Sequence, residues 1–446
     1  MKHHLDFYKA QLENHQIKVK SLFKTLSLYS ILRLSVFLLT GLGIYVTYNQ
    51  WQVALGIAIA GIVIFLVLLS KYTDLKHERE RYKRLVKINE EEIVIASGEF
   101  HDRADGSEFQ NPSHFYSLDI DLFGKGSFFQ YINRTTIKEG KECLVSQLLS
   151  NNIEQIPKRQ EAIRELVNMP EWRQNYSAIA QGVEVEHAAK NIIKWLKEHK
   201  PFLTKTWFGI TIGFSVTSVI VFGLAIAELI PLSLLGYWLL LGLALTARLL
   251  KPINLVSQHA SKAKETFRQY AQLLNTIEQA QFSSELLQEQ KNKIELNGIK
   301  ASEIFLKLSK HIDALDNRNN LISAIFGNGY FLWDIRQTYY IEQWISTYAL
   351  KVEDWFEVVT FFDAYNSLGN YGFNHKQFAY PKIVKGNDTI LAQGLGHPLL
   401  KLDKRIDSDL DVQREQFFIV TGANMAGKST FLRTVALHIV MANVGL

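Results

Sequence analysis

The sequence predicts a mainly α-helical protein in which four membrane-spanning helices form two hairpins, followed by the beginning of an α/β domain. Long uncharged runs occur in pairs, the segments between and after them carry apolar residues at three- and four-residue spacings, and residues 417–446 have the pattern of a strand, a glycine-rich loop and a helix. The chain has 446 residues, of which 47% are hydrophobic and 21% charged. This composition excludes a disordered or low-complexity chain. The single cysteine, Cys143, excludes an intrachain disulfide and a Cys-based metal site.

The first hairpin is predicted from two apolar runs near the N-terminus. Residues 31–48 and 53–70 contain one charged residue, Arg33 at the outer edge, and residues 49–52 separate the runs. At a rise of about 1.5 Å per residue, each run is close to the minimum length that crosses a hydrocarbon core about 30 Å thick. We therefore expect a pair of antiparallel transmembrane helices.

A second hairpin is predicted further along the chain. Residues 207–227 are uncharged, residues 228–231 form a turn, and residues 232–247 are again apolar before Arg248. Buried core helices of a soluble protein are the alternative, but paired runs with basic flanks favour membrane spans.

Lysine and arginine residues flank both hairpins, whereas the two connecting turns contain none. The positive-inside rule then places both termini and residues 71–206 in the cytoplasm, in a multi-pass protein of the cytoplasmic (inner) membrane. Lipid bilayer is the expected partner. The basic cluster Lys71–Lys87 directly follows a predicted span, so anionic lipid head groups are favoured over nucleic acid as its ligand.

The remaining sequence favours helices until the texture changes near residue 380. From Tyr380 onward, short apolar runs are broken by Gly-Asn-Asp and Gly-His-Pro, which is typical of a domain boundary. The predicted organisation is an N-terminal cytoplasmic helix (1–30), the first hairpin (31–70), a first part of the helical core (71–206), the second hairpin (207–250), a helical lever or second core part (251–380) and the start of a P-loop domain (381–446).

The strongest chemical signal is a phosphate-binding loop that satisfies G-x-x-x-x-G-K-[ST] in full. A β-type run precedes it, and a helix with a predicted apolar face of Phe431, Leu432, Val435, Ala436 and Ile439 follows. Backbone N–H groups of such a loop point at phosphate, its lysine reaches the β- and γ-phosphates, and its serine hydroxyl ligates Mg²⁺. The predicted ATP-binding residues are Gly422, Ala423, Asn424, Met425, Ala426, Gly427, Lys428, Ser429 and Thr430, with Ser429 as the Mg²⁺ ligand.

The run TGANMAGKSTFLRTVALHIVMANVG resembles the Walker A region of the MutS family, and Asn424, Met425 and Arg433 carry the likeness beyond a generic P-loop. Upstream, Asn133-Arg134-Thr135 and the segment from Arg159 to Ala162 resemble turns and helices of the MutS core domain. The segment from Gly396 to Leu400 resembles the approach to the family's ATPase domain, where His397 either lies near the nucleotide or, as the pattern favours, caps a turn.

The resemblance implies ATP and Mg²⁺ as ligands and a homodimer. It leaves open whether the protein also binds DNA. The family's mismatch-reading domain, with its Phe-x-Glu wedge, has no counterpart here, so mismatch recognition is not implied. The sequence ends at Leu446, before any strand that could supply a Walker B Asp-Glu, so we expect a truncated P-loop domain and leave hydrolysis, and hence enzyme status, open. Residues 359–363 are apolar and end in Asp363, as a Walker B strand would. They precede the loop, however, and match a helix of the family, so we do not expect them to be a Walker B strand.

These observations lead to the expectation of a membrane-anchored MutS-like ATP-binding protein in which nucleotide shifts a helical core. Two alternatives remain: a non-catalytic membrane scaffold with a relic P-loop, and the ATPase component of a membrane transport complex. Against a transport path, no ionisable residue lies in the middle of the predicted spans.

Overall fold

The protein is described here from a computed structural model. It describes residues 2–182, 189–296, 298–384, 388–401, 403–413, 416, 418–423 and 426–446, without the side chains of residues 2, 3, 388 and 389. The chain divides into two compact units. The first unit comprises Met1–Arg134, Val145–Gly182 and Asn366–Leu446, and the second comprises Thr135–Leu144 and Val183–Tyr365.

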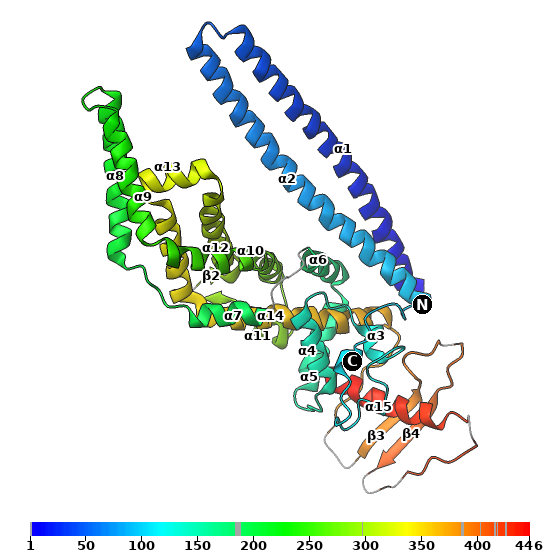
Figure 1. Cartoon of the computed structure of the whole chain (residues 1–446). Helices are drawn as coiled ribbons and strands as arrows, with labels where there is room; N and C mark the ends of the chain where they lie inside the picture. The colour runs from blue at the N-terminus through cyan, green and yellow to red at the C-terminus, as the bar shows by residue number, and fades with distance from the viewer. Residues whose placement is uncertain are drawn as a thin grey trace. The chain divides into compact units, whose positions relative to one another are not determined.

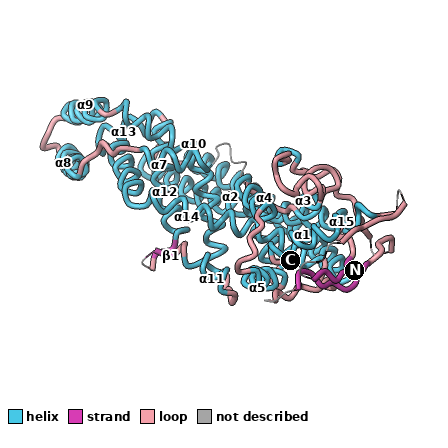
Figure 2. Tube along the Cα trace, turned by 90° about the horizontal axis from the view of Figure 1, so that it is seen from below, coloured by secondary structure: helices cyan, strands magenta, loops and turns pink. Residues whose placement is uncertain are grey.

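The described residues are mainly helical, as predicted (Figures 1 and 2). Helices of the first unit are α1 (Lys2–Val46), α2 (Trp51–Ala96), α3 (Phe128–Ile132), α5 (Ile156–Val167), α6 (Pro170–Ala180) and α15 (Lys428–Val444). Helices of the second unit are α7 (Ala189–Glu198), α8 (Lys205–Ile226), α9 (Ser233–Arg248), α10 (Leu250–Gln279), α11 (Glu285–Asn292), α12 (Ala301–Asp316) and α13 (Leu321–Phe331). Helices α4 (Lys138–Leu149) and α14 (Trp333–Asn374) have residues in both units, and short 3₁₀ turns are η1 (Ser107–Phe109) and η2 (Asn317–Asn319).

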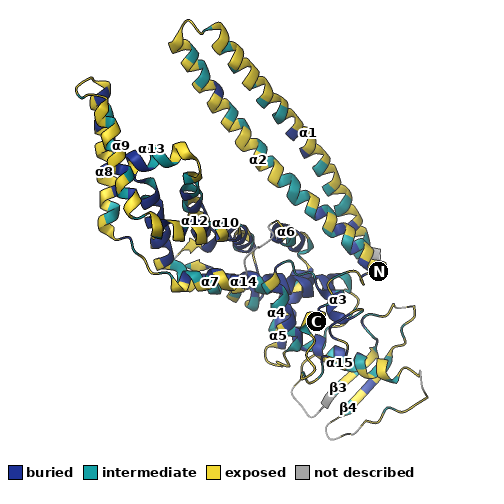
Figure 3. Cartoon of the chain, in the orientation of Figure 1, coloured by how far each residue is buried: buried dark blue, intermediate teal, exposed yellow. Residues whose placement is uncertain are grey.

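Helices α1 and α2 form a long hairpin in the first unit, and each continues well beyond its apolar run (Figure 1). No residue of the most apolar window of α1 is buried in the structure, and 6% of that of α2 is buried; Figure 3 colours the turn end of the hairpin mostly as exposed. Arg33, the one charge in the first run, stacks on the ring of Tyr72 with its guanidinium carbon 4.0 Å from the ring centroid. Both helices are long and apolar enough to cross a membrane.

The second predicted hairpin corresponds to α8 and α9. Helix α8 meets the length and composition of a membrane span by itself, whereas α9 meets them only together with α10, from which it is bent by 68°. Within the described residues, the structure therefore has three helices that could each cross a membrane, or four if the bent pair counts as one span.

The core of the second unit is a packed set of aromatic side chains on α10, α12 and α14. Phe267, Phe305 and Phe356 are nearly or fully buried, and the rings of Phe267 and Phe305 stack with their centroids 5.3 Å apart. Trp344 adds an edge contact to Phe267 and donates its indole N–H to the carbonyl of Ile304 at 2.9 Å. This apolar face explains why the segments from 254 onward form helices rather than loops.

The described residues contain two short antiparallel strand pairs: β1 (Glu295–Leu296) with β2 (Ile299–Lys300), and β3 (Asp388–Leu395) with β4 (Ser408–Gln413). In the second pair, Ile390 lies opposite Val412 and Ala392 opposite Leu410. The change of texture near residue 380 thus marks the end of the helical segment and the start of a β-hairpin.

Candidate nucleotide-binding site

The predicted phosphate loop lies at the N-terminal end of α15, in the first unit. Gly427 precedes the helix with φ +82°, a left-handed conformation that glycine adopts without strain. The first intrahelical bond runs from the N–H of Phe431 to the carbonyl of Gly427 at 2.9 Å. The backbone N–H groups of Lys428, Ser429 and Thr430 precede this bond, so they have no acceptor within the helix and lie at the positive end of the helix dipole.

Lys428 folds back onto its own loop. Its Nζ donates to the carbonyl oxygens of Gly422 at 2.6 Å and Ala423 at 2.7 Å. The ammonium group is thus held on the inner side of the loop by two neutral acceptors. A phosphate oxygen at the helix N-terminus would be a stronger, charged acceptor for the same group.

The other predicted loop residues lie where a ligand can reach them. Gly422, Ala423, Ala426 and Gly427 are exposed, as are the two hydroxyl residues that follow Lys428. Asn424 and Met425, which were also predicted to bind ATP, lie outside the described residues. The residues that are described therefore fit a phosphate group and, through the Ser429 hydroxyl, a hydrated Mg²⁺ ion.

Two details of the sequence prediction are wrong. Residues 418–420 do not form the expected strand before the loop, and Phe417 lies outside the described residues. A strand needs a neighbour to pair its N–H and C=O groups, and no strand of the described chain pairs with this run.

The second error is the buried face of α15. Leu432 and Ile439 are 55% and 41% exposed, while Leu437, Val440 and Met441 are buried together with Thr434 and Val444. Helix α15 is apolar around most of its circumference, so periodicity alone does not say which side packs. The side that packs is the one facing α5, where Gly445 approaches Arg159 too closely for any side chain larger than hydrogen.

A charged contact links α15 to the preceding body of the first unit. Arg433, one of the residues that carried the resemblance, pairs with Asp121 at 2.5 Å and donates from Nε to the carbonyl of Asp119 at 3.2 Å. At the far end of α15, the side-chain amide of Asn443 donates to Asn151 at 2.9 Å. Both ends of the helix are therefore tied to loops of the same unit.

The two histidines near this helix have structural partners. His397 accepts a hydrogen bond at Nδ1 from the N–H of Leu399 at 3.3 Å, which confirms the turn-capping interpretation. Nε2 of His438 lies 2.9 Å from the carbonyl oxygen of Gly396. Burial lowers the pKa of both imidazoles, and the nearby charge of Arg433 lowers that of His397 further, so both are neutral at pH 7.

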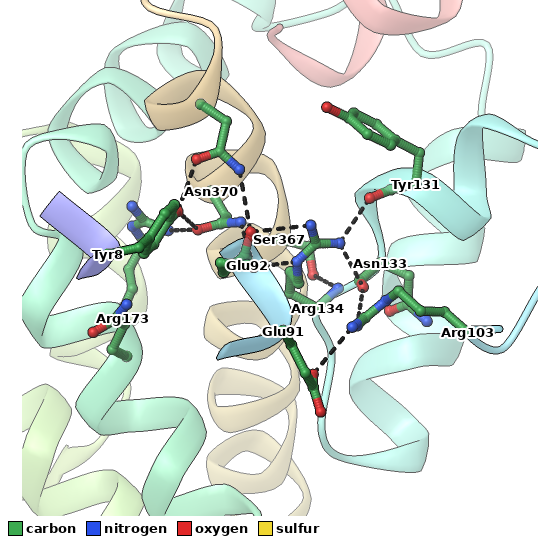
Figure 4. Close-up of polar contacts among 12 residues, drawn as sticks. Tyr8, Glu91, Glu92, Arg103, Tyr131, Asn133, Arg134, Arg173, Ser367 and Asn370 are labelled. Carbon is green, nitrogen blue, oxygen red and sulfur yellow. Dashed lines mark hydrogen bonds and ion pairs between the residues drawn. The ribbon is translucent and has the colours of Figure 1, made fainter. Parts of the chain in front are cut away.

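A buried polar cluster, which sequence reasoning missed, lies elsewhere in the first unit (Figure 4). Arg134, from the Asn-Arg-Thr turn, pairs through Nε and Nη2 with the two carboxylate oxygens of Glu92 on α2. Its Nη1 donates to the carbonyl of Tyr131 at 2.7 Å, and its backbone N–H to the hydroxyl of Ser367 on α14 at 3.0 Å. Nη1 also donates to the carbonyl of Asn133 at 3.1 Å, so each of the three guanidinium nitrogens has an acceptor.

The cluster continues to α1 and α6 through Asn370 on α14. The Asn370 amide donates to Glu92 at 3.0 Å, and its carbonyl oxygen accepts from Arg173 at 2.9 Å and from the Tyr8 hydroxyl at 3.2 Å. Figure 4 shows these side chains converging from α1, α2, α6 and α14. The polar end of the apolar hairpin is therefore joined to the body of the first unit by hydrogen-bonded, buried charges.

Electrostatics in the cluster favour the ion pair. Burial alone would raise the pKa of Glu92, but the charge and hydrogen bonds of Arg134 outweigh it and leave that pKa below its ordinary value. Conversely, burial lowers the pKa of Arg173 to about 10, which still leaves the guanidinium charged at pH 7. Only the Asn-Arg-Thr resemblance pointed toward this site, since Glu92 stands in a Glu-Glu-Glu run typical of a solvated face.

The acid of segment 359–363 has a structural role in the second unit. The segment lies inside α14, as the resemblance implied, and Asp363 is fully buried. Its carboxylate accepts from the backbone N–H groups of Thr136 and Ile137, both at 3.0 Å, and from the Thr136 hydroxyl at 3.0 Å. It thus caps the N-terminus of α4 from another helix. Burial raises the pKa of Asp363 to about 7 against these hydrogen bonds.

Among the residues that the structure describes, no group of three or more histidine, cysteine, aspartate or glutamate side chains could hold a metal ion. The metal-binding expectation therefore rests on Ser429 together with bound phosphate oxygens.

Comparison with known proteins identifies MutS proteins as relatives. The chain is 36% identical over 96 residues to the DNA mismatch repair protein MutS of Clostridium tetani, covering 20% of this chain and 10% of that protein. It is 44% identical over 64 residues to MutS of Chloroflexus aurantiacus, covering 14% and 6%. It is 33% identical over 103 residues to the DNA mismatch repair protein MutS 1 of Haloarcula marismortui, covering 23% and 11%.

No family model matches the chain. The matched segments span 6% to 11% of the length of these relatives. The chain is thus related to the MutS family through a segment of about a fifth of its own length.

Proposed function

We propose that this relative of the MutS proteins is a membrane-anchored ATP-binding protein whose nucleotide state changes the conformation of its helical body. The observation that carries the proposal is the complete phosphate-binding pattern of residues 422–430 at the N-terminus of α15, where the described residues other than the half-buried Lys428 are exposed. The relatives named MutS are DNA mismatch repair proteins. For this chain, nucleotide binding, DNA binding and dimer formation are proposals.

The residues around the loop would hold Mg²⁺-ATP by familiar contacts. Backbone N–H groups of residues 427–430 would bind phosphate oxygens, Lys428 would bind the β- and γ-phosphates, and the hydroxyl of Ser429 would be an Mg²⁺ ligand. Bound Mg²⁺-ATP supplies the negative charge that orders the loop. To make its contact, Lys428 exchanges the carbonyls of Gly422 and Ala423 for phosphate, so the loop has a distinct conformation in each state.

The response would pass along α15 into the first unit. Arg433 lies little more than one turn beyond Lys428 and contacts Asp119 and Asp121. A shift of the helix N-terminus therefore changes the setting of this loop of the body. Because the buried side of α15 packs on α5, movement is expected at its exposed N-terminal end rather than at Asn443.

Membrane anchoring is proposed through two hairpins, α1 with α2 and α8 with α9, with both termini and residues 71–206 in the cytoplasm. Support comes from the apolar windows of α1, α2 and α8, of which 0%, 6% and 28% are buried in the structure, and from the basic residues that flank both hairpins.

Several basic residues of the cluster Lys71–Lys87 already have partners within the protein, which reduces the number of candidates for lipid binding. Arg79 lies over the ring of Phe23, Arg84 donates to the carbonyl of Ala178, and Lys83 pairs with Glu80. Lys71 and Lys76 are exposed and nearest the apolar run. We therefore assign contact with anionic head groups to these two lysines.

Hydrogen exchange of the detergent-solubilised protein tests the nucleotide response. Adding ATP and Mg²⁺ should slow exchange of the amides in 422–430 and change exchange around 117–122. Lys428→Ala should abolish both effects, and Lys404→Ala, an exposed lysine outside the loop, should abolish neither. A chain that shows no nucleotide effect at all would instead fit the membrane-scaffold alternative.

A further inference from the structure

Helix α13 is an apolar helix that the sequence patterns did not single out. Residues 319–333 contain no aspartate, glutamate, lysine, arginine or histidine, and Asn320 caps the helix by accepting from the N–H groups of Ile322 and Ser323. The charged residues that flank this run, Arg318 and Asp334, pair with each other at 3.3 Å and are 16% and 3% exposed. Neither of the two charged residues that flank α13 is therefore exposed without a partner.

The C-terminal half of α13 packs against α8 and α9 within the second unit (Figure 1). Gly329 lies so close to α9 that a side chain at Gly242 would collide with its carbonyl group, and one at Gly329 would collide with Leu239. Small residues at a helix crossing are typical of helices that associate inside membranes.

The C-terminal carbonyls of α13 lie within hydrogen-bond distance of two hydroxyl groups on α8, which also lie near carbonyls of their own helix. The last carbonyls of a helix have no intrahelical donor. Here the hydroxyl of Ser218 lies 2.5 Å from the carbonyl oxygen of Tyr330, and that of Ser215 lies 3.3 Å from that of Phe331. The indole N–H of Trp238 on α9 donates to Ser218 at 2.7 Å. Such internal pairing is what a helix end needs where no water can reach it.

The position along α8 indicates the depth of this contact. Ser215 and Ser218 lie near the middle of α8, which runs from Lys205 to Ile226. If α8 crosses the membrane, the C-terminal end of α13 must meet it inside the hydrocarbon region.

The outer face of α13 is uncovered and apolar. Leu321, Ile322 and Phe326 are 73%, 68% and 52% exposed, and α8 exposes Val219 and Ile220 at 63% and 55%. Exposed apolar surface on two packed helices needs a partner. Its continuity with a helix long enough to cross a bilayer indicates that the partner is lipid.

We infer that α13 is a membrane-embedded helix that enters the bilayer beside α8 and α9 and contacts lipid acyl chains through Leu321, Ile322 and Phe326. This inference rests on the proposed membrane anchoring, because α8 sets the depth. The anchor then contains a helix too short to span, held in place by Ser215 and Ser218.

Site-specific fluorescence quenching tests the inference. In a Cys143→Ser background, single cysteines at Ile322 and Phe326 would carry bimane in proteoliposomes of phosphatidylcholine and phosphatidylglycerol. Val219→Cys on α8 is the membrane control, and Lys307→Cys, exposed on α12, is the aqueous control. Both test positions are exposed, so labelling should not disturb packing.

We expect the labels at Ile322 and Phe326 to lose most of their fluorescence to lipids with a nitroxide on the acyl chain and little to aqueous iodide, as at Val219. Quenching by iodide at both test positions, with lipid quenching at Val219, would overturn the inference and leave membrane anchoring intact. Quenching by iodide at Val219 as well would overturn both. If neither quencher reached the two test positions, a protein partner would cover them and the inference would be wrong.

Discussion

Glu92 and Arg134 form a buried ion pair that joins the polar end of α2 to the Asn-Arg-Thr turn in the first unit. The two side chains are 5% and 12% exposed, and Asn370 and Tyr131 complete their hydrogen bonds. Removing one partner of such a pair leaves the other charge buried without compensation. The pair therefore anchors the polar end of the apolar hairpin to the rest of the first unit.

Glu92→Gln should destabilise the protein strongly. Loss of the carboxylate leaves the guanidinium of Arg134 buried and unpaired, which in other proteins costs about 3 to 5 kcal/mol. Glu90→Gln, an exposed change on the same helix, should stay within about 0.5 kcal/mol of the parent. Chemical unfolding in detergent, followed by circular dichroism, measures both, and equal midpoints for the two variants would show that the pair does not hold the hairpin.

Asp363 should make stability depend on pH. Its pKa is about 7 in the folded protein against an ordinary 3.8, so between these values the folded state holds more protons than the unfolded state. The contribution to stability is then fully present below about pH 4 and is lost as pH rises through about 7. Roughly three pH units at about 1.4 kcal/mol each give an upper limit of about 4 kcal/mol.

Asp363→Asn isolates this effect. The amide keeps an oxygen to accept from Thr136 or Ile137 but does not titrate, so its unfolding free energy should change less between pH 5 and 8 than that of the parent. Subtracting the curve of unfolding free energy against pH of the variant from that of the parent cancels the contributions of histidines that titrate in the same range. Parallel curves would mean that the buried carboxyl is ionised throughout, held by the N-terminus of α4.

Ser218→Ala should destabilise the α8, α9 and α13 assembly. The change leaves the indole N–H of Trp238 and the carbonyl of Tyr330 without their partner, at about 1 kcal/mol. Thr217→Ala is the matched control, because that exposed hydroxyl bonds only within α8, to Gly213 at 2.9 Å. Thermal unfolding in lipid nanodiscs compares them, and a larger effect of the threonine variant would contradict the capping role of Ser218.

The contact between Arg433 and Asp121 should matter for coupling more than for stability. Their side chains are 43% and 59% exposed, so Arg433→Ala should change the unfolding free energy by less than about 1 kcal/mol. It should nevertheless reduce the ATP-induced change in hydrogen exchange around 117–122 while leaving protection of 422–430 in place. Full retention of the distal change in this variant would rule out the proposed route through α15.

Local patterns predicted the elements whose determinants are local. The apolar runs within residues 31–70 contain one charge, Arg33, over lengths that cross a membrane, and α1 and α2 follow from them. The loop around Lys428 was located by spacing alone. Helix α13 lies within the segment predicted to be helical, but it was not singled out as a membrane helix because its 11 residues are too few to span a bilayer.

Tertiary contacts explain the rest. Glu92 and Arg134 are far apart in the chain, and nothing in a run of three glutamates says which one is buried. The packed side of α15 depends on α5, so Leu432 and Ile439 were assigned to the wrong face. Residues 418–420 have strand-like composition, but a strand forms only where another strand pairs with it.

Equilibrium binding of ATP with Mg²⁺ to the purified, detergent-solubilised chain tests the central claim most directly, with Lys428→Ala and Lys404→Ala measured beside the parent. Loss of a charge-assisted contact with phosphate predicts binding about 10- to 100-fold weaker for Lys428→Ala and unchanged binding for Lys404→Ala. Equal affinity of all three proteins, or no binding by the parent, would contradict the assignment of the Gly422–Thr430 loop as a nucleotide site.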